Sequence, residues 1–153
     1  MRSLSGTMAA MTKRTFAPFV VVLLMLAGTA ACGSDASSGT AVTESDLAGA
    51  TYVSTSVTGH TLVKGTSIKL VFDSGNMAVS AGCNTQTGPY TLAGENLNWK
   101  TQPASTMMAC AEDLSAQDDW LRALFISGVA TTIDGTKMTM VKADVTIELS
   151  KES

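Results

Sequence analysis

The chain has 153 residues, of which ten are basic and thirteen acidic, so its formal net charge is −3. That length accommodates one domain of ordinary size plus a short additional segment. An acidic surface is a poor electrostatic match for nucleic acid, so the composition argues against a nucleic-acid-binding protein.

Residues 1–31 have the layout of a secretory signal peptide. Three basic residues, unaccompanied by any acidic residue, precede the apolar run TFAPFVVVLLMLAGTAA, which ends in small residues. A transmembrane helix is the rival interpretation, but the stretch at 16–31 has only sixteen residues, fewer than the roughly 20 that a membrane span needs. The sequence therefore predicts an exported protein from which residues 1–31 are removed.

The signal ends in TAAC at 29–32, which resembles a bacterial lipobox. After cleavage at a lipobox the cysteine becomes the first residue and carries acyl chains on its sulfur and amino group. Thr29 stands where leucine is usual, whereas Ala30, Ala31 and Cys32 fit the motif. The resemblance implies lipidation of Cys32 and a protein held on the extracytoplasmic face of the cell membrane by its lipid. The alternative is a nearby cleavage that leaves Cys32 as an ordinary thiol.

Residues 32–45 are rich in glycine, serine and other small residues, a composition that predicts a flexible tether. Removal of the signal leaves 122 residues with seven basic and thirteen acidic side chains, a charge of −6. Lipidation of Cys32 would leave Cys83 and Cys110 as a pair outside the cytoplasm, where disulfides form and persist. We therefore expect these two cysteines to be bonded, which requires their Cα atoms to lie within about 7 Å of each other.

Apolar and polar residues alternate over much of the remaining chain, which is the pattern of half-buried antiparallel strands. The expected apolar faces are Ile68, Leu70 and Phe72; Met77, Val79 and Ala81; and Val145, Ile147 and Leu149. Turn residues at 73–76, 93–96 and 134–135 separate strands and predict hairpins. Seven or eight short strands at this spacing predict a mainly β domain, either a small barrel or a sandwich.

One segment has helical spacing instead. Residues 112–127, EDLSAQDDWLRALFIS, carry four apolar residues on one helical face and acidic residues in the early turns, where they favour the helix dipole. Gly128 follows as a stop signal. We expect one amphipathic helix lying across the mouth or an open side of the β structure.

The segments GCNTQTGPYTL, LNW and PASTMMAC, followed by this helix, resemble the META domain, also called the HslJ-like domain. The resemblance covers residues 46–151 and implies a small antiparallel β-barrel-like domain with one helix, found in bacterial envelope proteins and linked to heat shock and antibiotic tolerance. Tyr52 stands where an early tryptophan is common, and Met107 replaces a frequent arginine. The second difference removes a fixed charge, so the sequence does not support anion binding at position 107.

Two kinds of reactive site are alternatives to a structural disulfide. A thiol nucleophile at Cys83 would need to be reduced and to have His60 within hydrogen-bond reach. A zinc site of Cys83, Cys110 and His60 lacks the close ligand pairs and the fourth ligand that zinc usually has. The disulfide explains both cysteines, so we expect no catalytic residue, no metal site and no cofactor.

The remaining polar candidates have simpler interpretations. Ser105 and Thr106 lack the Gly-x-Ser-x-Gly motif of a hydrolase and are expected to satisfy backbone groups in a turn. Asp118 and Asp119 are adjacent on a helix and so point in different directions. Four methionines, at positions 107, 108, 138 and 140, are expected to fill the core, although an adaptable apolar surface is the alternative.

Three functions remain open. The favoured one is a lipid-anchored, non-catalytic envelope module that binds another envelope protein or serves in a stress response. The second is a carrier of a small apolar ligand, which requires an unfilled barrel interior. The third is an inhibitor of a basic wall-degrading hydrolase, for which the charge of −6 and the surface location are the evidence.

Overall fold

The computed structural model describes residues 39–153. The predicted signal peptide, the predicted lipidation site Cys32 and residues 32–38 of the predicted tether lie outside the described residues. In chain order the elements are β1 (Thr40–Ala41), α1 (Glu44–Leu47), β2 (Thr51–Thr58), β3 (Lys69–Asp73), β4 (Asn76–Ser80), β5 (Thr85–Ala93), β6 (Asn96–Trp99), β7 (Ala104–Ser105), α2 (Glu112–Ile126), β8 (Val129–Asp134), β9 (Lys137–Lys142) and β10 (Val145–Lys151).

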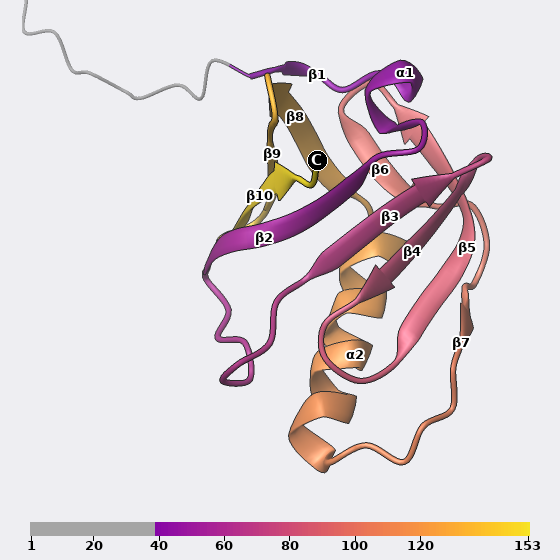
Figure 1. Ribbon diagram of the computed structural model, residues 1–153, viewed down its shortest axis with the longest axis vertical. Coiled ribbons are helices and arrows are strands. Elements are labelled where there is room, and N and C mark those ends of the chain that lie inside the picture. Colours follow the sequence, from indigo (N-terminus) through magenta and orange to yellow (C-terminus); the bar gives the residue numbers. More distant parts are fainter. Residues whose placement is uncertain (1–38) are drawn as a thin grey trace, which may run out of the picture. The chain divides into compact units, whose positions relative to one another are not determined.

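Eight antiparallel strands form a closed barrel, which confirms the predicted mainly β class (Figure 1). The neighbours run in the order β8, β6, β5, β4, β3, β2, β10 and β9, and β9 pairs with β8 to close the ring. The three predicted hairpins are confirmed as tight turns between β3 and β4, β5 and β6, and β8 and β9. In the first, Ser74 and Gly75 both have positive φ, 48° and 78°, as a type I′ turn requires.

Side chains fill the barrel interior. The predicted apolar faces are buried as expected, except that Val145 is half-buried. The rings of Tyr52 and Phe72 meet edge to face with centroids 6.3 Å apart, and Met138 and Met140 are 0% and 1% exposed. This packing is the core on which the stability of the domain depends.

The ordered structure starts ahead of residue 46, the expected domain boundary. Thr40 and Ala41 of β1 pair with Ile133 and Thr132 of β8, and the next residue, Val42, is buried. The cause is the short strand β6, which covers β8 only at its first two residues and leaves the rest of that edge open. A two-residue strand has no periodic pattern, so composition alone indicated a tether here.

The short helix α1 is capped by Thr43 and contacts β5 through a side-chain hydrogen bond. The Thr43 N–H donates to Asp46 Oδ2 at 2.8 Å, and hydrogen bonds from Thr43 hold the pKa of Asp46 below its usual range. The Tyr90 hydroxyl donates to Glu44 Oε2 at 2.6 Å. Burial, together with this bond, raises the pKa of Tyr90 to about 12.

The helix α2 ends at Ile126, one residue before the predicted end at residue 127. It covers the side of the barrel where β6 is short (Figure 1). Leu121, Leu124 and Phe125 are buried, and the Phe125 ring lies 5.5 Å from that of Trp99. No helix within residues 39–153 combines the length and apolar character needed to cross a bilayer.

Gln117 is a buried polar residue of α2, only 3% exposed, and its amide connects three parts of the barrel end. Its Oε1 accepts from the Val63 N–H at 2.7 Å, and its Nε2 donates to the Ala81 carbonyl at 2.5 Å and to Thr66 Oγ1 at 3.0 Å. The loops that follow β2 and β4 are therefore both fastened to the helix.

We predict that Gln117→Leu lowers the free energy of unfolding by about 2 to 4 kcal/mol, because the buried Ala81 carbonyl and the partly buried Val63 N–H would lose their hydrogen-bond partner. Denaturant unfolding measures the change. The matched control is Gln102→Leu at an exposed position, expected to change the free energy by no more than about 0.5 kcal/mol. Equal effects of the two substitutions would contradict the structural role of Gln117.

Candidate functional site

The disulfide predicted between Cys83 and Cys110 is present, with Cα atoms 6.2 Å apart. Cys83 lies in the loop between β4 and β5, and Cys110 lies two residues before α2. Ligand atoms of Cys83, Cys110 and Asp118 lie within 4.8 Å of one another, but bonded sulfurs are neither thiolate ligands nor nucleophiles. The ring of His60, the suggested base or third ligand, instead stacks on Trp120 at a centroid distance of 3.7 Å.

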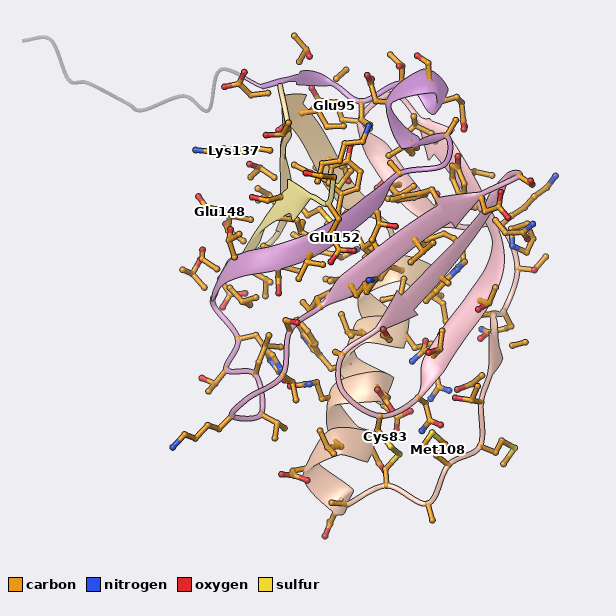
Figure 2. All side chains as sticks on the ribbon, in the orientation of Figure 1. Cys83, Glu95, Met108, Lys137, Glu148 and Glu152 are labelled. Carbon is orange, nitrogen blue, oxygen red and sulfur yellow. A yellow bond between two sulfur atoms is a disulfide. The ribbon has the colours of Figure 1, made fainter. Side chains whose placement is uncertain are left out.

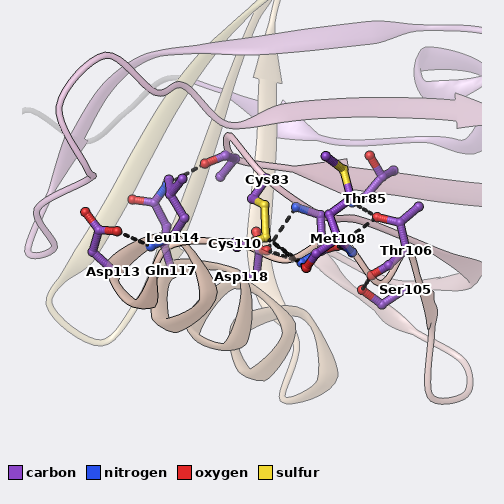
Figure 3. The surroundings of a disulfide bond; sticks show 12 residues. Cys83, Thr85, Ser105, Thr106, Met108, Cys110, Asp113, Leu114, Gln117 and Asp118 are labelled. Atoms are coloured by element: carbon purple, nitrogen blue, oxygen red, sulfur yellow. Dashed lines mark hydrogen bonds between the residues drawn. A yellow bond between two sulfur atoms is a disulfide. The ribbon is translucent and has the colours of Figure 1, made fainter.

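Asn84 connects the disulfide to its surroundings through a hydrogen bond to Cys110 Sγ. Figure 3 shows the disulfide with Thr106, Met108 and Asp118 nearby. Its side-chain oxygen accepts from the Met108 N–H and from Thr106 Oγ1, both at 3.0 Å. Its side-chain nitrogen donates to Asp118 Oδ2 at 3.0 Å and to Cys110 Sγ at 3.1 Å. A single side chain thus joins α2 to the segment before it, a role that sequence reasoning did not assign to it.

Asp118 and Asp119 have different environments, as expected for adjacent helical positions. Asp118 is buried, and its Oδ2 also accepts from the Asn84 backbone N–H at 3.0 Å. Asp119 is exposed and forms an ion pair with Arg122 on the same helix. Among the described residues, Asp118 Oδ1 and the neighbouring Gln86 Oε1 are buried acceptors without a hydrogen-bond partner.

Thr106 has the backbone-satisfying role that the sequence predicted. Its hydroxyl accepts from the Thr85 N–H at 3.0 Å, and its own N–H donates to the Thr85 carbonyl at 3.0 Å. The Ser105 hydroxyl donates to the Thr106 carbonyl at 3.0 Å. The Thr106 hydroxyl and backbone therefore hold the end of β7 against β5, whereas the Ser105 hydroxyl satisfies a carbonyl within its own segment.

The expectation that all four methionines fill the core is wrong for two of them. Met138 and Met140 are buried, but Met107 and Met108 are 97% and 63% exposed. The physical reason is the fastening of residues 106–110: Thr106, the Met108 backbone and Cys110 are all tied toward the barrel, so both methionine side chains project outward. We call residues 106–110 the methionine loop.

The methionine loop borders a shallow hollow of about 520 Å³. It is lined by Asn84, Ser105, Thr106, Met107, Met108, Ala109 and Arg122. Figure 2 shows Cys83 and Met108 close together at the end of the domain where α2 begins. The two exposed methionines present an adaptable apolar surface at this end of the domain, which is the alternative that the sequence left open for them.

The model of the family described as META domain matches residues 45–153. Two solved structures, both determined by NMR, are similar to the chain. One, from Burkholderia xenovorans, has 19% sequence identity and a TM-score of 0.56. The match covers 71% of this chain and 86% of the chain in that structure. The other has 24% identity and a TM-score of 0.57, and the match covers 71% of this chain and 94% of the chain in that structure. At these identities the likeness shows the fold alone. No curated protein matches the chain.

We predict that the double substitution Cys83→Ser and Cys110→Ser lowers the free energy of unfolding by about 3 to 4 kcal/mol, because the bond closes a loop of moderate length in the unfolded chain. Amides of the methionine loop should also exchange faster with solvent. Denaturant unfolding and hydrogen exchange measure the two effects. Cys32→Ser, outside this covalent loop, is the control; a double variant as stable as that control would contradict the prediction.

Proposed function

The chain belongs to the META domain family, and we propose that it is a lipid-anchored, non-catalytic module of the cell envelope that binds another envelope protein. The proposed anchor is Cys32, at the end of a segment with the layout of a lipoprotein signal. The disulfide supports an oxidising compartment, which an extracytoplasmic domain would occupy.

The exposure of Met107 and Met108 is the observation that carries the proposed binding function. Water contact with two large apolar side chains is unfavourable, and burial against a partner would relieve it at about 25 cal/mol per Å². Because the methionine loop is already fastened, binding would order few additional groups, which keeps the entropic cost low. An interaction in a stress response is compatible with the same surface.

A carrier of a small apolar ligand has less support. Such a carrier needs an interior that is not filled by side chains. Bulky residues occupy the interior of the described barrel, among them Tyr52, Phe72, Met138 and Ile147. The methionine loop therefore provides a better basis for a binding function than the barrel interior does.

We predict that mass spectrometry of the protein from its native cells finds an amino terminus at Cys32 that carries acyl chains. Cys32→Ser should move the protein out of the membrane fraction, because the acyl chains provide the attachment. A Ser38→Ala variant, changed in the tether, is expected to remain in that fraction. An intact amino terminus at Met1, or an unmodified Cys32 thiol, would contradict the proposed anchor.

We predict that a photo-reactive p-benzoylphenylalanine at position 107 forms a cross-link to one envelope protein in intact cells. The same group at the exposed position Thr101 is the matched control and should give no such product. Replacing Met108 with glutamate should reduce the yield of the product from position 107, because it places a charge in an apolar contact. Identical products from positions 107 and 101 would contradict a specific methionine-loop interface.

A further inference from the structure

The second half of β2 pairs with a strand on one side only. Residues Thr51–Val53 of β2 pair with β3, and the last bond between them joins the Ser54 N–H to the Ile68 carbonyl at 2.8 Å. Beyond this point β2 continues to Thr58, paired with β10 alone. Within the described domain, no strand occupies the continuation of β3 beside residues 55–58.

A β-bulge marks the place where the two strands separate. Ser54 is the register partner of Leu149 and Ser56 is the partner of Glu148, so Thr55 is an extra residue in β2. Bulges bend a strand and increase its twist. The bend lies where the chain that leads into β3 departs from β2, and it accounts for the space between them.

That space is a surface groove of about 310 Å³, which we call the β2 groove. Its lining consists of Ser54, Thr55, Ser56, Val57, His60, Thr61, Leu62, Thr66 and Ser67. Six of these nine side chains carry hydroxyl groups, and none is an acid, lysine or arginine. Because the lining has no acidic, lysine or arginine side chain to pair with an ion, it suits an uncharged polar ligand better than an ionic one.

Hydrogen bonds and a ring stack hold the walls of the β2 groove in place. Gln117 holds Val63 and Thr66 against α2, and the Ser54 hydroxyl accepts from the Ile68 N–H at 2.9 Å. The ring of His60 is stacked on Trp120 with an angle of 5° between their planes. A groove that is already formed binds with a smaller loss of conformational entropy than a mobile one.

An open strand edge offers unpaired main-chain N–H and C=O groups, which are complementary to another extended polypeptide. Natural proteins usually protect such edges with lysine, proline or other charged side chains, or with a β-bulge. Residues 55–58 of β2 are Thr-Ser-Val-Thr, so the edge carries the bulge at Thr55 but none of the protective side chains. A glycan is the alternative neutral occupant, but His60, the one aromatic ring in the lining, already has a face covered by Trp120.

We propose that the β2 groove binds an extended, uncharged polypeptide segment of a partner protein, which adds beside residues 55–58 as a strand in line with β3. Alternate small side chains of that segment would contact the hydroxyl-lined walls, since successive side chains of a strand point to opposite faces. The β2 groove and the hollow at the methionine loop have no lining residue in common. A negative result for peptide binding at the β2 groove would therefore leave the proposed methionine-loop interface and the proposed lipid anchor unaffected, and the reverse also holds.

The test is selection of random heptapeptides displayed on phage against the purified chain, followed by NMR titration of the labelled protein with the enriched peptides. We expect enrichment of uncharged sequences and shifts of the backbone amides at 55–58 and 66–67. Methylation of alternate peptide nitrogens should abolish binding, because it removes main-chain donors. No enrichment, or shifts confined to other residues, would overturn the proposal.

Variants that fill the groove test its location. Ser67→Tyr is expected to weaken peptide binding by at least about tenfold, whereas the matched Ser153→Tyr at the exposed carboxyl end leaves it unchanged. If Ser67→Tyr does not fold, Thr61→Tyr is a second variant that fills the groove, and Thr101→Tyr at an exposed position is its control. Unchanged affinity in a folded groove variant would overturn the proposal. So would a titration in which chitotetraose, and not the peptides, shifts the groove amides.

Discussion

The contacts made by one turn of α2 hold together the end of the barrel on which both candidate surfaces lie. β6 is too short to cover the whole of β8 and β5, and α2 packs where the sheet is incomplete. A helix in that position buries Gln117 and Asp118 along with its apolar residues, and buried polar groups need partners. Gln117 bonds to the loop after β2 and the loop after β4, and Asp118 bonds through its Oδ2 to the loop after β4.

This arrangement explains how the loops that border the two surfaces are held in place. Gln117 fastens the loop that forms one wall of the β2 groove. Asp118, Asn84 and the disulfide fasten the methionine loop. Each surface is an exposed segment supported by buried contacts, so a partner would meet a shape that already exists and binding would cost little ordering.

Much of the fold could be predicted from local sequence patterns. Alternation identified the buried faces of β3 and β4, turn residues located three hairpins, and helical spacing placed α2 to within one residue. The strands β1 and β7 were missed, because two residues are too few to show a period and their pairing depends on where distant strands end.

The candidate sites were harder to predict, because they depend on contacts between residues far apart in the sequence. Asn84 and Gln117 are ordinary polar residues in the chain, and only the fold places their partners around them. The methionines show what could have been inferred. Met138 and Met140 have the spacing of one strand face, whereas Met107 and Met108 are adjacent and therefore lack the alternation of a half-buried strand.

The most direct test of this account is hydrogen exchange at two amides, those of Val63 and Asn84. The first donates to Gln117 Oε1 at 2.7 Å and the second to Asp118 Oδ2 at 3.0 Å, so both report on the fastening of loops to α2. If α2 and the two loops form one rigid unit with the barrel, both amides should open with the same free energy as the Leu70 amide in the core strand β3. Exchange of either amide at a free energy well below that of Leu70 would show that the loop moves independently, and would contradict the account.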